Sequence, residues 1–195
     1  NGQTSTADLH LEANESAFIV FSNEQETGLT DYSPTEKETL LTIDTPWKVD
    51  FQKGMRGPDE TYVMTELQTW DKNEDERIRY FSGTATYTNT FKLKKQPDQP
   101  VWIDLGRVMV MARVYVNNQY AGGVWTSPYR LNIQHLLHKG TNTLRVEVVN
   151  NWQNRLIGDQ KLPENERPTW TSVNPWRADS PLQESGLIGP VRLLQ

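Results

Sequence analysis

Apolar and polar residues alternate along much of this chain with a period of two, which is the period of a half-buried β-strand. The pattern is sharpest where Ala85, Tyr87, Phe91 and Leu93 alternate with a row of polar residues, mostly threonines. Strands are predicted at 17–21, 39–43, 47–51, 84–93, 101–105, 110–116 and 143–149. Short strands separated by frequent turn signals are typical of sandwiches, so we predict an all-β fold, an antiparallel β-sandwich of jelly-roll type.

A few segments depart from the strand pattern. Residues 133–138 favour a single helical turn, because a glycine follows shortly after them. The pair Asn117-Asn118 predicts a tight turn at the end of a strand. The charged run 71–77 is expected to be a solvated loop.

The chain divides into a less patterned beginning and a long sandwich. Residues 1–36 are read as a linker or the end of a preceding domain, and 37–195 as the sandwich with a long C-terminal wrapping tail. The tail carries Trp152, Trp170 and Trp176 among arginines and repeated prolines. Proline fixes φ and removes a backbone donor, so the tail cannot form one helix or a long regular strand. The start of the chain lacks Met and a signal-peptide pattern, which favours a fragment of a longer protein.

Composition narrows the classes of partner. The 195 residues carry a formal net charge of −5, which argues against nucleic acid and against an anionic membrane surface. No apolar run approaches the ~20 residues that a membrane-spanning helix needs. The chain has no cysteine, so it has neither disulfides nor thiolate metal ligands.

Several sequence runs resemble known carbohydrate-active proteins. The runs YFSGTATYTNTFKL, DLGRVMVMARVYVNNQYAGGVWTSPYRLNI and HLLHKGTNTLRVEVVNN follow one another between Tyr80 and Asn151. They resemble the sugar-binding jelly-roll domain that accompanies family 2 glycoside hydrolases. The tail runs NRLIGDQKLP, TWT and ESGLIGPVRL are similar to the C-terminal region of family 106 α-L-rhamnosidases, which end in a galactose-binding-like sandwich. The resemblance implies a galactose-binding-like fold for 37–195 and a periplasmic or secreted location.

Indole rings beside hydrogen-bonding groups suit sugar recognition, because a sugar stacks its C–H face on an aromatic ring. The candidate carbohydrate-binding residues are Trp125, Tyr129, Trp152, Asn154, Arg155, Asp159 and Trp176. A structural alternative stays open. In it Trp152 and Trp170 are buried as a plug at the end of the sandwich, and Arg155 and Asp159 form a buried hydrogen-bonded pair. Trp47 and Trp102 lie in predicted strands and are expected in the core.

Catalysis by this chain alone is not expected. Glycoside hydrolysis uses two carboxyl groups ~5–5.5 Å or ~6.5–9.5 Å apart, and such enzymes commonly hold them in a barrel of ~250 residues. The chain has neither that length nor the helices, so no catalytic residue and no metal ligand are assigned. A structural calcium ion is a runner-up expectation, because jelly-roll modules often hold one through oxygen ligands, but no ligands can be named.

The resemblance and the composition together predict a non-catalytic accessory domain of a multidomain bacterial glycoside hydrolase, rhamnosidase-like in type. Its expected partner is the catalytic domain of the same polypeptide, on which it would pack, with an oligosaccharide as a second expected partner. The alternative is a purely structural module between domains that binds no sugar. No cofactor is expected.

Overall fold

The computed structural model describes residues 11, 16–18 and 38–195. Residues 19–21 of the predicted strand at 17–21, and most of the predicted linker 1–36, therefore lie outside the described residues. The strands are β1 (Thr39–Thr42), β2 (Trp47–Phe51), β3 (Tyr62–Met64), β4 (Thr84–Leu93), β5 (Trp102–Asp104), β6 (Arg107–Met109), β7 (Met111–Val116), β8 (Gln119–Val124), β9 (Arg130–Asn132), β10 (Gly140–Val149), β11 (Gly186–Gly189) and β12 (Arg192–Leu194). The helices are α1 (Glu76–Arg79), α2 (Gln153–Asp159) and the short 3₁₀ turns η1 (Trp70–Lys72), η2 (Gln134–Leu136) and η3 (Glu164–Glu166).

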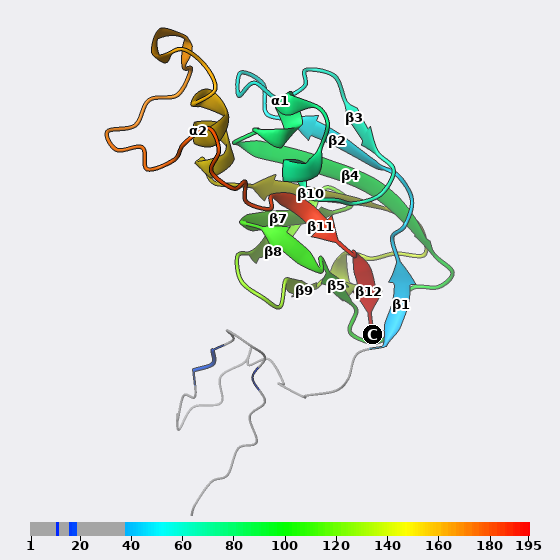
Figure 1. Cartoon of the computed structure of the whole chain (residues 1–195). Helices are drawn as coiled ribbons and strands as arrows, with labels where there is room; N and C mark the ends of the chain where they lie inside the picture. The colour runs from blue at the N-terminus through cyan, green and yellow to red at the C-terminus, as the bar shows by residue number, and fades with distance from the viewer. Residues whose placement is uncertain (1–10, 12–15, 19–37) are drawn as a thin grey trace, which may run out of the picture.

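The strands form two main sheets that enclose one core (Figure 1). The larger sheet has six strands in the order β3-β2-β4-β10-β7-β8, and the smaller has four in the order β1-β12-β5-β9. A separate pair, β11 and β6, lies beside them. The paired strands run antiparallel throughout these sheets. This arrangement confirms the predicted all-β antiparallel sandwich.

The longest strands, β4 and β10, have ten residues each and pair along their whole length, from Thr84–Val149 to Leu93–Gly140. Alternate residues of both strands are buried, while the threonines of β4 face away from the core. Burying one face of a strand produces the period-two pattern in the sequence. The prediction for these strands is therefore confirmed.

An aromatic cluster fills the centre of the core. Trp70 and Tyr87 stack with ring centroids 6.5 Å apart and an interplanar angle of 5°. The Trp70 indole donates a 2.6 Å hydrogen bond to the Tyr87 hydroxyl, and the backbone N–H of Leu187 donates to the same oxygen at 3.2 Å. Burial raises the pKa of the Tyr87 phenol, so it stays neutral and accepts these hydrogen bonds. Trp47 packs edge-on against Tyr87 and is 1% exposed, which confirms its predicted place in the core.

Trp102 is only half-buried, so its predicted place in the core is wrong. Val101, Ile103 and Leu105 are buried on either side of it. Successive side chains of a strand point to opposite faces, so Trp102 must lie on the outer face of the smaller sheet.

The chain changes sheets between β1 and β2, which follow one another but do not pair. The turn between them is held by Asn89 of β4. The Asn89 side-chain amide donates to the carbonyl of Thr45 at 3.0 Å, and the Thr45 hydroxyl donates to the Asn89 side-chain oxygen at 2.9 Å. Further on, Asn117 and Asn118 both have positive φ, 51° and 65°, which confirms the tight turn between β7 and β8.

The C-terminal tail forms neither one helix nor a long strand, as predicted, but it is more than a wrapper. It contains α2 and the strands β11 and β12, and β12 lies between β1 and β5 inside the smaller sheet. Leu187, Val191 and Leu193 of this part are at most 1% exposed. The predicted helical turn at 133–138 is η2, and the predicted loop at 71–77 instead contains parts of η1 and α1.

Candidate functional site

Two exposed tryptophans lie in loops that follow strands at the same end of the larger sheet. Val124, the last residue of β8, pairs with Ala112 of β7, and Met111 of β7 pairs with Val149, the last residue of β10. Trp125 follows β8 directly, and Trp152 comes just before α2. The strands β8 and β10 are separated by β7 alone. Because neighbouring strands lie ~4.8 Å apart, the two loops that carry these indoles start roughly 10 Å from each other.

Helix α2 is fixed to the sandwich by close packing and by hydrogen bonds. Ile157 is 1% exposed, and a Cβ on Gly158 would come within 2.6 Å of the Tyr80 ring, so only glycine allows this approach. The Asn154 side chain, 2% exposed, holds the backbone of Gln183 on both sides. It donates to the Gln183 carbonyl at 2.7 Å and accepts from the Gln183 N–H at 2.8 Å. Asn154 thereby ties the returning tail to α2.

A pocket of about 120 Å³ lies beside the N-terminal end of α2. It is smaller than the ~300–1,000 Å³ sites that hold drug-sized ligands, so it suits one small ring or group. The residues that line it come from the turn after β2, the residue pair before β4, the start of α2 and the tail. They are Gly54, Met55, Arg56, Ser82, Trp152, Arg155, Pro168 and Thr169.

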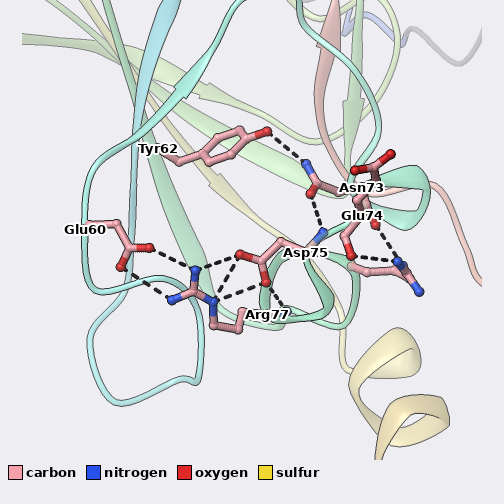
Figure 2. A network of polar contacts seen from close by, with 7 residues as sticks. Glu60, Tyr62, Asn73, Glu74, Asp75 and Arg77 are labelled. Carbon is pink, nitrogen blue, oxygen red and sulfur yellow. Dashed lines mark hydrogen bonds and ion pairs between the residues drawn. The ribbon is translucent and has the colours of Figure 1, made fainter.

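The turn after β2, residues 52–61, forms one wall of this pocket and is held by a network of charged groups (Figure 2). Arg77 of α1 donates to Glu60 at 2.9 Å and to Asp75 at 2.8 Å. Asp75 also caps α1, accepting from the backbone N–H of Arg77 at 2.8 Å. The side-chain hydrogen bonds from Arg77 lower the pKa of both Glu60 and Asp75. Through Glu60, this network fixes the end of the turn that leads into β3, and Arg56 lies in the same turn.

Arg155 and Asp159 lie one turn apart on α2 and are both shielded from solvent, with side chains 13% and 3% exposed. Their closest atoms, Nη1 and Oδ1, are 3.7 Å apart, which is longer than a hydrogen bond. Burial lowers the pKa of Arg155 most, the nearby positive charge of Arg56 lowers it further, and Asp159 raises it. Within the part of the chain that the structure describes, Arg155 Nη2 and Asp159 Oδ2 have no hydrogen-bond partner.

Comparison with known proteins identifies the chain's family. A family model for the glycosyl hydrolase 2 galactose-binding-like domain matches residues 62–181. The chain belongs to this family. The match confirms the resemblance seen in the sequence and covers most of the sandwich.

The relatives of this galactose-binding-like domain are much longer proteins. A putative β-glucuronidase of Formosa agariphila is 36% identical in an alignment of 154 residues that covers 66% of this chain and 13% of that protein. The rhamnosidase of Novosphingobium sp. PP1Y is 41% identical with a TM-score of 0.76, over 85% of this chain and 16% of that one. A β-glucuronidase of Ruminococcus gnavus, 18% identical with a TM-score of 0.56, covers 83% of this chain and 30% of its own, and supports the fold alone. The chain therefore spans a small part of these proteins.

The domain brings together only part of the predicted carbohydrate-binding set. Trp152 and Arg155 line the pocket, and Asp159 lies behind Arg155 on the same helix. Asn154 is buried, and its side-chain amide is already hydrogen-bonded to the backbone of Gln183. The remaining candidates do not line the pocket: Trp125 is exposed, Trp176 is half-buried, and Tyr129 packs against the core.

The alternative in which tryptophans plug the sandwich is wrong for the two residues it named. Trp152 is 53% exposed and Trp170 is 85% exposed. The same alternative predicted that Arg155 and Asp159 form a buried hydrogen-bonded pair. The two side chains are buried, but their closest atoms, 3.7 Å apart, are too far from each other for a hydrogen bond. The core is already filled by aromatic and aliphatic side chains of the strands, so these indoles have no interior space to occupy.

The pocket also includes residues that the sequence did not single out, chiefly Arg56, Ser82 and Thr169. They lie far apart in the chain. Ser82 and Thr169 fall within the runs YFSGTATYTNTFKL and TWT that carry the resemblance, and Arg56 lies outside those runs, but no local pattern marks any of the three as a site residue. Among the described residues, no group of three or more His, Cys, Asp or Glu side chains is arranged to hold a metal ion. No helix in the described part of the chain is long and apolar enough to cross a membrane.

Proposed function

We propose that this chain is a non-catalytic accessory domain of a multidomain bacterial glycoside hydrolase, rhamnosidase-like in type, and that it packs on the catalytic part of the same polypeptide. The observation that carries the proposal is a set of exposed apolar side chains, called here the apolar set. Its members, at one end of the larger sheet and on the tail, are Val110, Met111, Trp125, Trp152, Leu162, Trp170 and Val173.

The tail part of the apolar set lies on a segment that projects away from the sheets. Trp170 is 85% exposed and Val173 is 75% exposed. Figure 1 draws α2 and the chain that follows it, in gold to orange, extending beyond the sandwich. Exposed apolar surface of this kind marks a contact with another protein surface. Burying it stabilises the complex by ~25 cal/mol for each Å² of apolar surface taken from water.

The composition of the apolar set favours a protein partner over a sugar. Sugars stack on aromatic rings, but Val110, Met111, Leu162 and Val173 offer no ring. Aliphatic and aromatic side chains together are what the centre of a protein–protein interface contains. The relatives are several times longer than this chain, which spans 16% of the Novosphingobium rhamnosidase. The rest of the parent polypeptide is thus the partner that we propose.

A non-catalytic role fits the chemistry of the pocket. Glycoside hydrolysis needs two carboxyl groups facing the scissile bond, yet none of the residues that line the pocket is acidic. Asp159, which lies beside Arg155 on α2, is only 2% exposed. The catalytic carboxylates of the parent enzyme would therefore come from outside this chain. With the relatives being glycoside hydrolases by name, we propose a periplasmic or secreted location for the parent.

The packing proposal is tested by mixing the chain with the separately produced remainder of its polypeptide and measuring affinity by calorimetry. Trp170→Ala should weaken binding by ~2 kcal/mol or more, as buried tryptophans at interface centres do. Val173→Ala should also weaken it, whereas Val63→Ala should not. Val63 is a matched control, since it is 57% exposed but lies on β3, outside the apolar set. Equal affinity for the Val173 and Val63 variants and no loss with Trp170→Ala would refute packing through this surface.

A second candidate function, carbohydrate binding, is favoured by one specific observation. Trp152 keeps an exposed indole at the same pocket that Arg155 lines. This combination of a stacking surface and a hydrogen-bonding cation is the arrangement that sugar sites use. We propose Trp152 and Arg155 as its central residues, with Asp159 orienting Arg155, and Trp125, Tyr129, Asn154 and Trp176 outside it.

A further inference from the structure

Two arginines line the pocket, and the carboxylate of Asp159, which pairs with Arg155, balances only one of their two charges. Arg56 and Arg155 both line it, and no lining residue is acidic. The chain as a whole has a net charge of −5, so this is a local reversal of sign. Burial lowers the pKa of Arg155 most, and the positive charge of Arg56 adds to this lowering. Two like charges held this close in a hollow are stabilised by an anion between or beside them.

Arg155 also has unused hydrogen-bonding capacity. A guanidinium offers five N–H donors, but among the described residues Nη2 of Arg155 has no acceptor. The closest atoms of Arg155 and its ion-pair partner Asp159, Nη1 and Oδ1, are 3.7 Å apart, so Nη1 does not donate a direct hydrogen bond to Oδ1. Buried donors are nearly always paired in folded proteins. Nη2 is itself shielded from solvent, so a ligand would contact the part of Arg155 that lines the pocket.

The backbone at Arg56 is held in an unfavourable conformation. Arg56 has a φ of 64°, in the left-handed region that large side chains avoid. The turn is fixed around it, because a Cβ on Gly57 would meet Phe51 and Phe81 at 2.7–2.9 Å. Such strained positions persist where the surrounding structure imposes them and gather at binding sites. The packing around this turn therefore holds Arg56 at the pocket despite its unfavourable φ.

The rest of the lining suits a sugar ring better than a simple anion. Ser82 and Thr169 bring hydroxyl groups, and Ser82 donates to the carbonyl of Asn151 at 2.9 Å, which leaves its oxygen free to accept. Trp152, 53% exposed, supplies an indole face. A small pocket with cations, hydroxyls and one aromatic ring matches a ring that carries both hydroxyl groups and a carboxylate.

We propose that this pocket binds the carboxylate-bearing ring of an acidic sugar, a uronic acid residue, with Arg56 and Arg155 pairing with the carboxylate and Trp152 covering the ring. The inference deepens the second candidate function, carbohydrate binding, and rests on it. It shares Trp152 with the packing proposed for the apolar set and otherwise rests on different residues.

The test titrates the whole chain with three probes at low ionic strength: sodium glucuronate, glucose and sodium acetate. Binding is followed by the indole N–H signals of the tryptophans in NMR spectra. Glucuronate should bind at least about tenfold more tightly than glucose, because a charge-assisted hydrogen bond contributes about that factor. It should also bind about tenfold more tightly than acetate, which has no ring for Trp152.

Two pairs of variants assign the contacts. Arg56→Asn removes the charge with a residue that tolerates positive φ and should lower glucuronate affinity by about tenfold, while Arg113→Gln, on the exposed face of β7, should leave it unchanged. Trp152→Ala should weaken glucuronate but not acetate binding. Trp125→Ala, at an indole outside the pocket, should change neither.

The other outcomes overturn the inference in distinguishable ways. Equal affinity for glucuronate and glucose would refute the acidic-sugar preference and leave neutral carbohydrate binding. Equal affinity for glucuronate and acetate, insensitive to Trp152→Ala, would replace the sugar with a plain carboxylate, such as an acidic side chain elsewhere in the polypeptide. No shift with any probe would refute both this inference and the second candidate function, without touching the packing proposal.

Discussion

The substitution Gly186→Ala tests whether the C-terminal tail is part of the core. Gly186 opens β11 and has a φ of 93°. A Cβ there would lie 2.4 Å from Nε1 of Trp70 and 2.8 Å from the hydroxyl oxygen of Tyr87. Because both groups are buried and hydrogen-bonded to each other, neither can move aside without breaking that bond. Gly186→Ala should therefore destabilise the fold through a clash and through backbone strain.

A matched variant separates these two costs. Gly140 has nearly the same φ, 94°, but a Cβ there would meet nothing within 4 Å. Both substitutions should carry the backbone cost of roughly 1–3 kcal/mol. Only Gly186→Ala should add ~1–3 kcal/mol for overpacking and ~1 kcal/mol for the weakened hydrogen bond. The free energy of unfolding of the two variants should thus differ by about 2–4 kcal/mol.

The measurement is urea unfolding followed by far-UV circular dichroism, with thermal unfolding as a second reading. For a chain of this size, a difference of ~3 kcal/mol corresponds to about 6–12 °C in Tm. Equal losses for the alanine variants of Gly186 and Gly140 would refute the reasoning. They would mean that β11 does not rest on the Trp70–Tyr87 pair as described.

Other predictions concern the contacts that hold the pocket walls. Asn154→Ala should lower the free energy of unfolding by ~2–4 kcal/mol, because it leaves both backbone groups of Gln183 unpaired; an unchanged urea midpoint would contradict this. Asp75→Ala removes the cap of α1 and should cost ~1 kcal/mol, whereas the exposed neighbour Glu74→Ala should stay within ~0.5 kcal/mol. The pKa of Asp75 is lowered in the folded state by Arg77, so its contribution is full above the ordinary value of 3.8 and is lost as pH falls through the lower folded value. The stability difference between the wild type and Asp75→Ala should accordingly shrink below pH 3.8 and stay constant above it.

The larger sheet could be predicted from the sequence because its strands bury one face each. The strand β2 is found at Trp47–Phe51, with the predicted bounds, and β4 at Thr84–Leu93. In both, buried and less buried residues alternate along the strand. A local pattern of period two is sufficient to recognise such strands.

The smaller sheet could not be predicted in the same way. The strand β12 has only three residues, Arg192–Leu194, and its partners β1 and β5 lie much earlier in the chain. Three residues are too few to establish a period, and pairing between distant segments leaves no local signal. The helix α2 was missed for a related reason, since Gly158 weakens its helix propensity and its stability comes from packing on Tyr80.

The candidate site was predictable only in part because proximity in the fold decides it. Trp152 and Arg155 are neighbours in sequence and were found together, but Arg56 and Ser82 reach the pocket from other segments. Trp152 and Trp170 illustrate a second limit. A tryptophan is usually buried, and only the filled core of this sandwich explains why these two are not.

Trp152 belongs both to the apolar set and to the pocket, so the two proposals meet at this residue. A variant at Trp152 alone cannot separate them, because it would weaken packing and sugar binding together. Trp170 and Arg56 each belong to one proposal only, since Trp170 does not line the pocket and Arg56 is not apolar. Loss of affinity for the catalytic part with Trp170→Ala, at unchanged glucuronate affinity, would mean that the domain uses this end for two separate contacts. If glucuronate binding instead disappears once the catalytic part is bound, the pocket lies under the interface, and its arginines serve the assembly rather than a sugar.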